Sequence, residues 1–233
     1  MSNGDAGSTL TITPPAPINN PSTITIQDIY SGPFSGVNRH DVLASGDGGL
    51  TPYNFNIDSS FIFTTRITLT AGDNSPRKEA GIRINSPVTG DMLFIINSDA
   101  GEIVTFGGPF HLFGNNAGGN GYTPGTSILL GIKQVGGGDG NGGIATTTEF
   151  FIDRGSGIIT TGPLAWTNLE KGPVNFQLGI YAQGGSDGGL VVSDYINAVF
   201  ADTTFTIIPE PGTFSLVALG LFGVLAFRRK HQA

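Results

Sequence analysis

Apolar and polar side chains alternate along much of this chain, and that period of two restricts the fold more than any other feature. The clearest stretch is residues 61–69, where one face would hold Phe61, Phe63, Ile67 and Leu69. Successive side chains of a β-strand point to opposite faces of its sheet. The pattern therefore predicts a half-buried strand rather than a helix.

Similar short segments recur as far as residue 208, separated by turns rich in Gly, Asp, Asn and Pro. Gly supplies 37 of the 233 residues and only 12% of the chain is charged, which is typical of short strands joined by tight turns. We predict eleven strands, at residues 23–26, 50–57, 61–69, 80–84, 92–97, 102–106, 127–134, 146–153, 174–182, 190–193 and 198–208. This number of strands favours an all-β fold, a two-sheet antiparallel sandwich of the jelly-roll type.

Composition divides the chain into three parts. Residues 1–22 contain four prolines among Asn and Ser and are predicted to form an extended leader. Residues 23–208 would form a single β-sandwich ectodomain, and residues 209–233 a separate C-terminal segment. Within the leader, residues 9–13 alternate polar with apolar, which suits either a plain spacer or a strand added to another subunit's sheet edge.

Charge and cysteine content exclude several function classes. The formal net charge is −7, and three of the eleven Lys and Arg lie in the last six residues, so the ectodomain is more acidic still. Such a surface does not favour nucleic acid, and we predict no nucleic-acid partner. The absence of Cys excludes a disulfide framework and a thiolate metal site.

Few residues suit catalysis. Only His40 and His111 precede the C-terminal segment, and neither lies in a sequence typical of a catalytic triad or a zinc site. A glycoside hydrolase would need two carboxyl groups about 5 Å or about 6.5–9.5 Å apart. Glu149 and Asp153 share a predicted strand face but would lie roughly 13 Å apart, and nothing singles out a pair such as Glu102 with Glu149. We therefore predict no catalytic residue and no enzyme, with a polysaccharide-degrading glycoside hydrolase as the weaker alternative.

Two acidic, Gly-rich loops are candidate calcium sites. They are residues 136–143, with Asp139, and residues 184–189, with Asp187. Gly lets the backbone fold around a cation while Asp and Asn supply hard oxygen ligands. The alternative is that Gly and Asp only form long hairpin turns, so calcium is the one possible cofactor and otherwise none is expected.

Three aromatic residues are candidates for glycan binding, which uses a ring stacked on a sugar beside polar groups. Trp166 is the only Trp and follows Gly162 and Pro163 in a predicted loop. Tyr122 lies beside Asn120 and Gly121, and Tyr181 is close to Gln183. For Trp166 the alternative is a plug that closes one end of the sandwich.

The C-terminal segment begins with two prolines that a strand cannot accommodate, because proline lacks a backbone N–H and forces the preceding residue into extended geometry. Residues 213–227 then carry no charge and are followed by three basic residues, Arg228, Arg229 and Lys230. An all-apolar helix with a basic end favours a membrane, with the basic residues on the cytoplasmic side. A buried core helix is the alternative.

The order Pro209-Glu210-Pro211, apolar helix and basic end resembles the PEP-CTERM sorting signal of Gram-negative exosortase substrates. The resemblance implies a transmembrane helix that holds the protein in the inner membrane and cleavage near Pro-Glu-Pro by an exosortase-type membrane protease. It also implies passage to the outer envelope or the extracellular matrix, and association with exopolysaccharide and biofilm. The family pattern includes an N-terminal signal peptide, whose basic and apolar regions residues 1–7 lack, so we expect the sequence to begin downstream of it.

The segment 79–84, with residues 94–103 after it, resembles the concanavalin A-like lectin and glucanase sandwich. Together, these observations predict an exported cell-surface or matrix protein with a non-enzymatic structural or adhesive sandwich. A lectin-like carbohydrate-binding module is the alternative.

Overall fold

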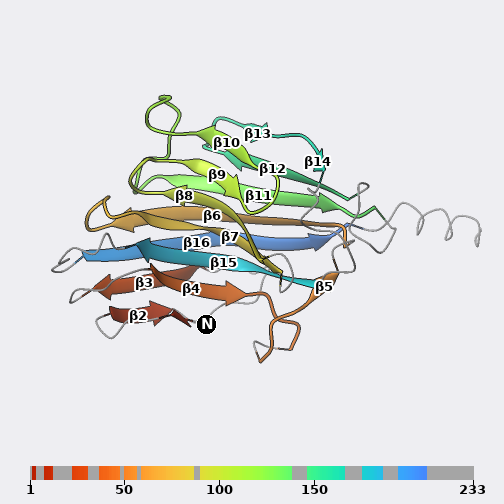
Figure 1. The fold of residues 1–233 in the computed structure, drawn as a ribbon, viewed down its shortest axis with the longest axis horizontal. Helices are drawn as coiled ribbons and strands as arrows, with labels where there is room; N and C mark the ends of the chain where they lie inside the picture. The colour runs from red at the N-terminus through yellow and green to blue at the C-terminus, as the bar shows by residue number, and fades with distance from the viewer. Residues whose placement is uncertain are drawn as a thin grey trace, which may run out of the picture.

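The computed structural model describes residues 2–3, 8–12, 23–30, 37–47, 50–56, 59–86, 90–137, 146–165, 175–185 and 194–208. These residues form β-strands, turns and loops, and they contain no helix. The strands make two antiparallel sheets, and in Figure 1 they run along the long axis of the molecule. The predicted all-β, two-sheet sandwich is thus confirmed.

Sheet A contains seven strands in one path and a short strand beside it. In spatial order they are β1 (Ser2–Asn3), β4 (Val37–Leu43), β15 (Asn175–Gly185), β7 (Lys78–Ser86), β8 (Gly90–Asn97), β9 (Ile103–Phe106) and β10 (His111–Gly114), with β5 (Phe55–Asn56) paired to β15.

Sheet B is built in the same way. In spatial order its strands are β13 (Ile158–Thr160), β12 (Thr147–Asp153), β11 (Ser127–Val135), β6 (Phe61–Ala71), β16 (Asp194–Ile207), β3 (Ile24–Tyr30) and β2 (Ser8–Ile12), with β14 (Leu164–Ala165) paired to β12.

Six strands lie outside the predicted ranges, namely β1, β2, β4, β10, β13 and β14. β2 lies within the leader, where it pairs with β3 of the same chain rather than with another subunit. β4 was missed because its inward positions are occupied by Asn38 and His40, which hide the apolar alternation. The strand predicted at residues 190–193 lies outside the described residues, and the domain boundaries remain a prediction.

Aromatic rings from both sheets form the core of the sandwich. Phe94 of sheet A meets Phe150 of sheet B edge to face at 5.4 Å, and Phe176 lies 5.8 Å from Phe61 across the same layer. All four rings are buried. Burying each such side chain contributes about 1.5–3 kcal/mol, so this layer accounts for much of the stability of the fold.

A cluster of buried polar groups also joins the sheets from inside. Asp28 of β3 accepts hydrogen bonds from His40 Nε2 at 2.7 Å and Asn38 Nδ2 at 3.1 Å, both on β4. Lys78 of β7 forms an ion pair with Asp194 of β16. Buried charges are tolerated only when paired, so each link ties one position of sheet A to one position of sheet B.

Within the described part of the chain, no helix is long and apolar enough to cross a membrane. The apolar segment 213–227, for which a transmembrane helix was predicted, lies outside that part.

Candidate site on the outward face of sheet A

The central strands of sheet A carry a band of polar side chains on the face turned away from the core. In β15, alternate residues from Phe176 to Ala182 face the core, which leaves the residues between them outward. Cross-strand pairing places Asp41 and Gly81 on either side of Tyr181, and Arg39 and Glu79 on either side of Gln183. We call this set the polar band: Arg39, Asp41, Glu79, Arg83, Asn85, Asp91, Gln177, Tyr181 and Gln183.

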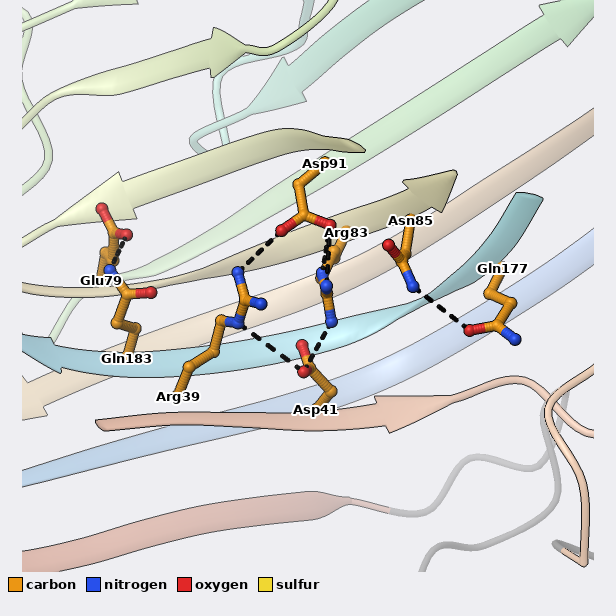
Figure 2. Close-up of polar contacts among 8 residues, drawn as sticks. All are labelled: Arg39, Asp41, Glu79, Arg83, Asn85, Asp91, Gln177 and Gln183. Atoms are coloured by element: carbon orange, nitrogen blue, oxygen red, sulfur yellow. Dashed lines mark hydrogen bonds and ion pairs between the residues drawn. The ribbon is translucent and has the colours of Figure 1, made fainter. Parts of the chain in front are cut away.

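Four members of the polar band form a closed ring of alternating charge (Figure 2). Arg83 Nη1 donates to Asp41 Oδ2 at 2.7 Å, and Arg83 Nη2 donates to Asp91 Oδ1 at 2.7 Å. Arg39 Nη1 donates to Asp91 Oδ2 at 2.8 Å and lies 3.8 Å from Asp41 Oδ2 through Nε. Residues of β4, β7 and β8 are thereby fixed relative to one another.

Gly179 leaves room for the ring of charged side chains to extend across β15. It pairs with Leu43 on one side and with Arg83 on the other, so it lies on the outward face beneath the ring. A Cβ at this position would meet the Val42 carbonyl oxygen and Leu43 Cα, which are backbone atoms. Only Gly allows β4 to approach β15 this closely.

The ring is largely removed from water. The side chains of Arg83 and Asp41 are only 9% and 5% exposed. Burial by itself would lower the pKa of Arg83, but its hydrogen bonds to Asp91 and the charge of Asp41 raise it instead. Arg83 is therefore a permanent cation, and no described residue hydrogen-bonds to the buried Asp41 Oδ1.

A second group of polar residues surrounds Glu79. Gln183 Nε2 donates to Glu79 Oε1 at 2.7 Å, and Arg77 Nε donates to Glu79 Oε2 at 3.0 Å. Arg77 Nη1 also donates to Glu102 Oε2 at 3.1 Å. Burial raises the pKa of Glu79, although the nearby Arg77 opposes that shift.

Tyr181 occupies the middle of the polar band and is completely buried. Burial, and then the negative charge of Glu79, raise the pKa of Tyr181 well above its ordinary value, so its hydroxyl stays protonated. A side-chain hydrogen bond to Glu79 also raises the pKa of Tyr181 and opposes the rise in the pKa of Glu79. A protonated hydroxyl held beside a carboxylate on a polar sheet face is a candidate proton donor to a bound ligand.

The polar band continues in two directions. At one end, Asn85 Nδ2 donates to Gln177 Oε1 at 3.3 Å, and these amides retain further hydrogen-bonding capacity. Toward β9, the same outward face becomes apolar where Tyr181 packs with Ile95 and Val104. Leu93 and Phe106 complete this apolar part.

Of the three aromatic candidates, the structure places only Tyr181 in this band. Tyr122 is buried in the core, where its hydroxyl accepts from Leu69 N at 2.8 Å and donates to Thr126 O at 2.8 Å. That environment leaves its ring no free face for a sugar. Trp166 lies outside the described residues.

The other predicted site residues lie outside the described residues as well. They are Asp139 and Asp187 of the calcium proposal, Pro209, Glu210 and Pro211 of the sorting motif, and Arg228, Arg229 and Lys230 of the basic end. No group of three or more His, Asp or Glu side chains suited to a metal occurs in the part of the chain that is described. Calcium therefore remains a prediction.

The two carboxylates considered for glycoside hydrolysis are associated with different sheets and have separate polar partners. Glu102 immediately precedes β9 of sheet A and accepts from Asn97 and Arg77. Glu149 is on β12 in sheet B, where it accepts from Thr160 Oγ1 at 2.5 Å and lies 3.6 Å from Lys133 Nζ.

The charged residues of the polar band were missed because they come from three strands, β4, β7 and β8. No local motif joins Arg39, Asp41, Arg83 and Asp91, and their proximity depends on strand pairing. A signal was nevertheless present in residues 175–183, where Asn, Gln, Gly, Tyr and Gln alternate with apolar residues. In residues 79–85, likewise, Glu79, Arg83 and Asn85 alternate with the core residues.

Comparisons with known proteins give a sorting motif and a fold. Residues 208–230 match the model of the PEP-CTERM protein-sorting motif, which marks proteins for membrane-anchored sorting and export to the cell surface. None of the curated proteins compared with the sequence matches it.

Several solved structures resemble the chain. An alginate lyase of family 7, A1-II′, in complex with a product, has a TM-score of 0.51 and 9% identity over 80% of each chain. An alginate lyase from Corynebacterium sp. has a TM-score of 0.49 and 15% identity, over 78% of this chain and 76% of that one. A polysaccharide lyase of family 18 has a TM-score of 0.46 and 11% identity, over 88% and 96%.

These comparisons correct one prediction. We expected no enzyme, but the solved structure that shares this sandwich with a TM-score of 0.51 is an alginate lyase, so that expectation is wrong. No local catalytic motif marks such a site in the sequence, because a sheet face assembles its polar residues from separate strands. At these identities the likeness shows the fold alone. The chain thus has a jelly-roll sandwich of the kind found in alginate lyases, followed in the sequence by a PEP-CTERM sorting motif.

Proposed function

We propose that this protein is exported and acts on an exopolysaccharide, which it binds and cleaves at the polar band of sheet A. The observation that carries the proposal is the buried Tyr181 hydroxyl, which stays protonated beside Glu79 and lies amid paired Arg, Asp and Gln side chains.

Cleavage by elimination fits the groups in the band. In such a reaction a base removes the proton from the carbon beside a uronate carboxylate, the electron pair forms a carbon–carbon double bond, and the glycosidic bond breaks with protonation of the leaving oxygen. Tyr181 would protonate the leaving oxygen, since its raised pKa keeps the hydroxyl neutral. Asp41, the cross-strand neighbour of Tyr181, would accept the proton through its unpartnered Oδ1.

Substrate binding must also neutralise the uronate carboxylate, because negative charge builds up beside it in the transition state. Gln183 and the Asn85–Gln177 amide pair supply N–H donors on both sides of Tyr181. Since Tyr181 is fully buried, the side chains around it must move when the chain binds. We expect a polymer rather than a single sugar to supply the binding energy for that movement.

The test uses the full-length chain with alginate as the acidic probe and a neutral glucan for comparison. We expect products that absorb ultraviolet light, because elimination leaves a double bond conjugated to the carboxylate. Tyr181→Phe should abolish product formation and retain alginate binding. Binding without product from the wild type would instead indicate the carbohydrate-binding module, and no binding to either polymer would reject the site altogether.

A further inference from the structure

The hairpin between β9 and β10 projects a large aromatic side chain into solvent. Phe110 is 67% exposed, although it is preceded by a turn whose backbone is well fixed. Thr105 Oγ1 donates to the Pro109 carbonyl at 2.7 Å and accepts from His111 N at 2.8 Å, which closes the turn. The ring is thus held outside the core by specific hydrogen bonds.

This hairpin is packed directly against the charged ring of the polar band. Gly107 has a φ of +73°, and a Cβ there would meet the carbonyl oxygen of Asp91. Asp91 is the residue that binds both Arg39 and Arg83. The turn that precedes Phe110 therefore starts beside one end of the polar band.

The apolar part of the outward face leads from the band to Phe110. Leu93 pairs with Arg83 on one side and with Phe106 on the other, so these side chains follow one row across β7, β8 and β9. The rings of Phe106 and Phe110 are 6.3 Å apart at 48°. Leu112, 40% exposed, extends the neighbouring row through Ile95 and Val104.

We propose that Phe110, supported by Phe106, is a stacking platform for a pyranose ring of the polysaccharide chain, next to the polar band. Sugar rings present an apolar C–H face to aromatic rings and hydroxyl groups to polar side chains, and the two parts of this face offer both. This inference rests on the proposed function and identifies where a longer chain gains affinity.

The experiment compares three full-length proteins: wild type, Phe110→Ala and Ile158→Ala. Ile158 is a matched control, because it is 65% exposed but lies on β13 at the edge of sheet B. With alginate chains of graded length, we expect Phe110→Ala to weaken Kd about tenfold for long chains and little for the shortest that bind, at unchanged thermal melting. Phe110→Trp should restore the affinity, and Ile158→Ala should bind as the wild type does.

Three outcomes separate the possible failures. If the wild type binds no alginate of any length, the proposed function fails and the platform fails with it. If the wild type binds and Phe110→Ala binds equally well, only the platform is rejected. If Phe110→Ala instead changes the oligomeric state measured by light scattering, the exposed ring contacts a second copy of the chain and the inference is overturned.

Discussion

Replacing Lys78 by Met should destabilise the sandwich strongly without changing its shape. Lys78 is fully buried and pairs with Asp194, which is 2% exposed. Lys78 Nζ also donates to the Asp73 carbonyl at 2.8 Å. Met fills a similar volume but leaves Asp194 as a buried charge without its partner, which typically costs about 3–5 kcal/mol.

Two backbone hydrogen bonds reduce that loss. Asp194 Oδ1 accepts from Asp73 N at 2.9 Å and from Tyr195 N at 2.8 Å, and both bonds survive the substitution. We therefore expect the lower part of the range, about 3 kcal/mol, which is a large fraction of the roughly 5–15 kcal/mol that stabilises a typical domain.

The assay is urea denaturation of the full-length protein at neutral pH, followed by tryptophan fluorescence and far-UV circular dichroism. The midpoint should fall while the slope with denaturant stays the same, since the surface exposed on unfolding is unchanged. The double variant Lys78→Met/Asp194→Asn is the control, because it removes both charges and keeps the acceptor oxygen. It should regain most of the loss, and a single variant that loses less than about 1 kcal/mol would refute the reasoning.

Three further predictions follow from other parts of the chain. Burial raises the pKa of Glu79 above its ordinary 4.5, so the stability contributed by its protonated form is present below 4.5 and is lost as the pH rises through the higher folded value. The melting temperature of the wild type should therefore fall relative to that of Glu79→Gln as the pH rises above 4.5. Parallel curves of melting temperature against pH for the two proteins would contradict this. A Cβ on Gly184 would collide with the Tyr30 hydroxyl, so Gly184→Ala should cost about 1–3 kcal/mol in urea denaturation, whereas Gly155→Ala, in open space, should cost only its backbone strain. Replacing Pro209, Glu210 and Pro211 by Ala should leave uncut protein in the inner membrane, and normal release on membrane fractionation would count against exosortase-type processing.

The fold could be predicted because its information is local. Alternation in residues 61–69 is the same in the sequence and in β6, where the apolar set is buried and the polar set faces outward. β4, by contrast, could not be predicted from local alternation. Its inward Asn38 and His40 are acceptable only because Asp28, from the other sheet, hydrogen-bonds to both. A sequence pattern cannot supply that partner in advance.

The candidate site was only partly predictable for the same reason. Tyr181 was chosen because polar residues follow it in the sequence, which is a local signal. Its neighbours Asp41 and Glu79 come from β4 and β7, and the register of β15 brings them together. The segment 79–84 was recognised as resembling a lectin or glucanase sandwich, but its Glu79 and Arg83 could be assigned to a site only once the direction of their side chains was known.

The most direct test of the account compares the two outward faces of the sandwich in one binding experiment. Gln183→Ala and Asn85→Ala alter the polar band of sheet A, whereas Lys133→Ala alters an exposed position on sheet B that lies 3.6 Å from Glu149. The affinity of each full-length variant for alginate can be measured by isothermal titration calorimetry, alongside its melting temperature. The account predicts that both sheet A variants lose affinity at unchanged stability while Lys133→Ala binds as the wild type does. Loss of affinity in Lys133→Ala with the sheet A variants unaffected would contradict it.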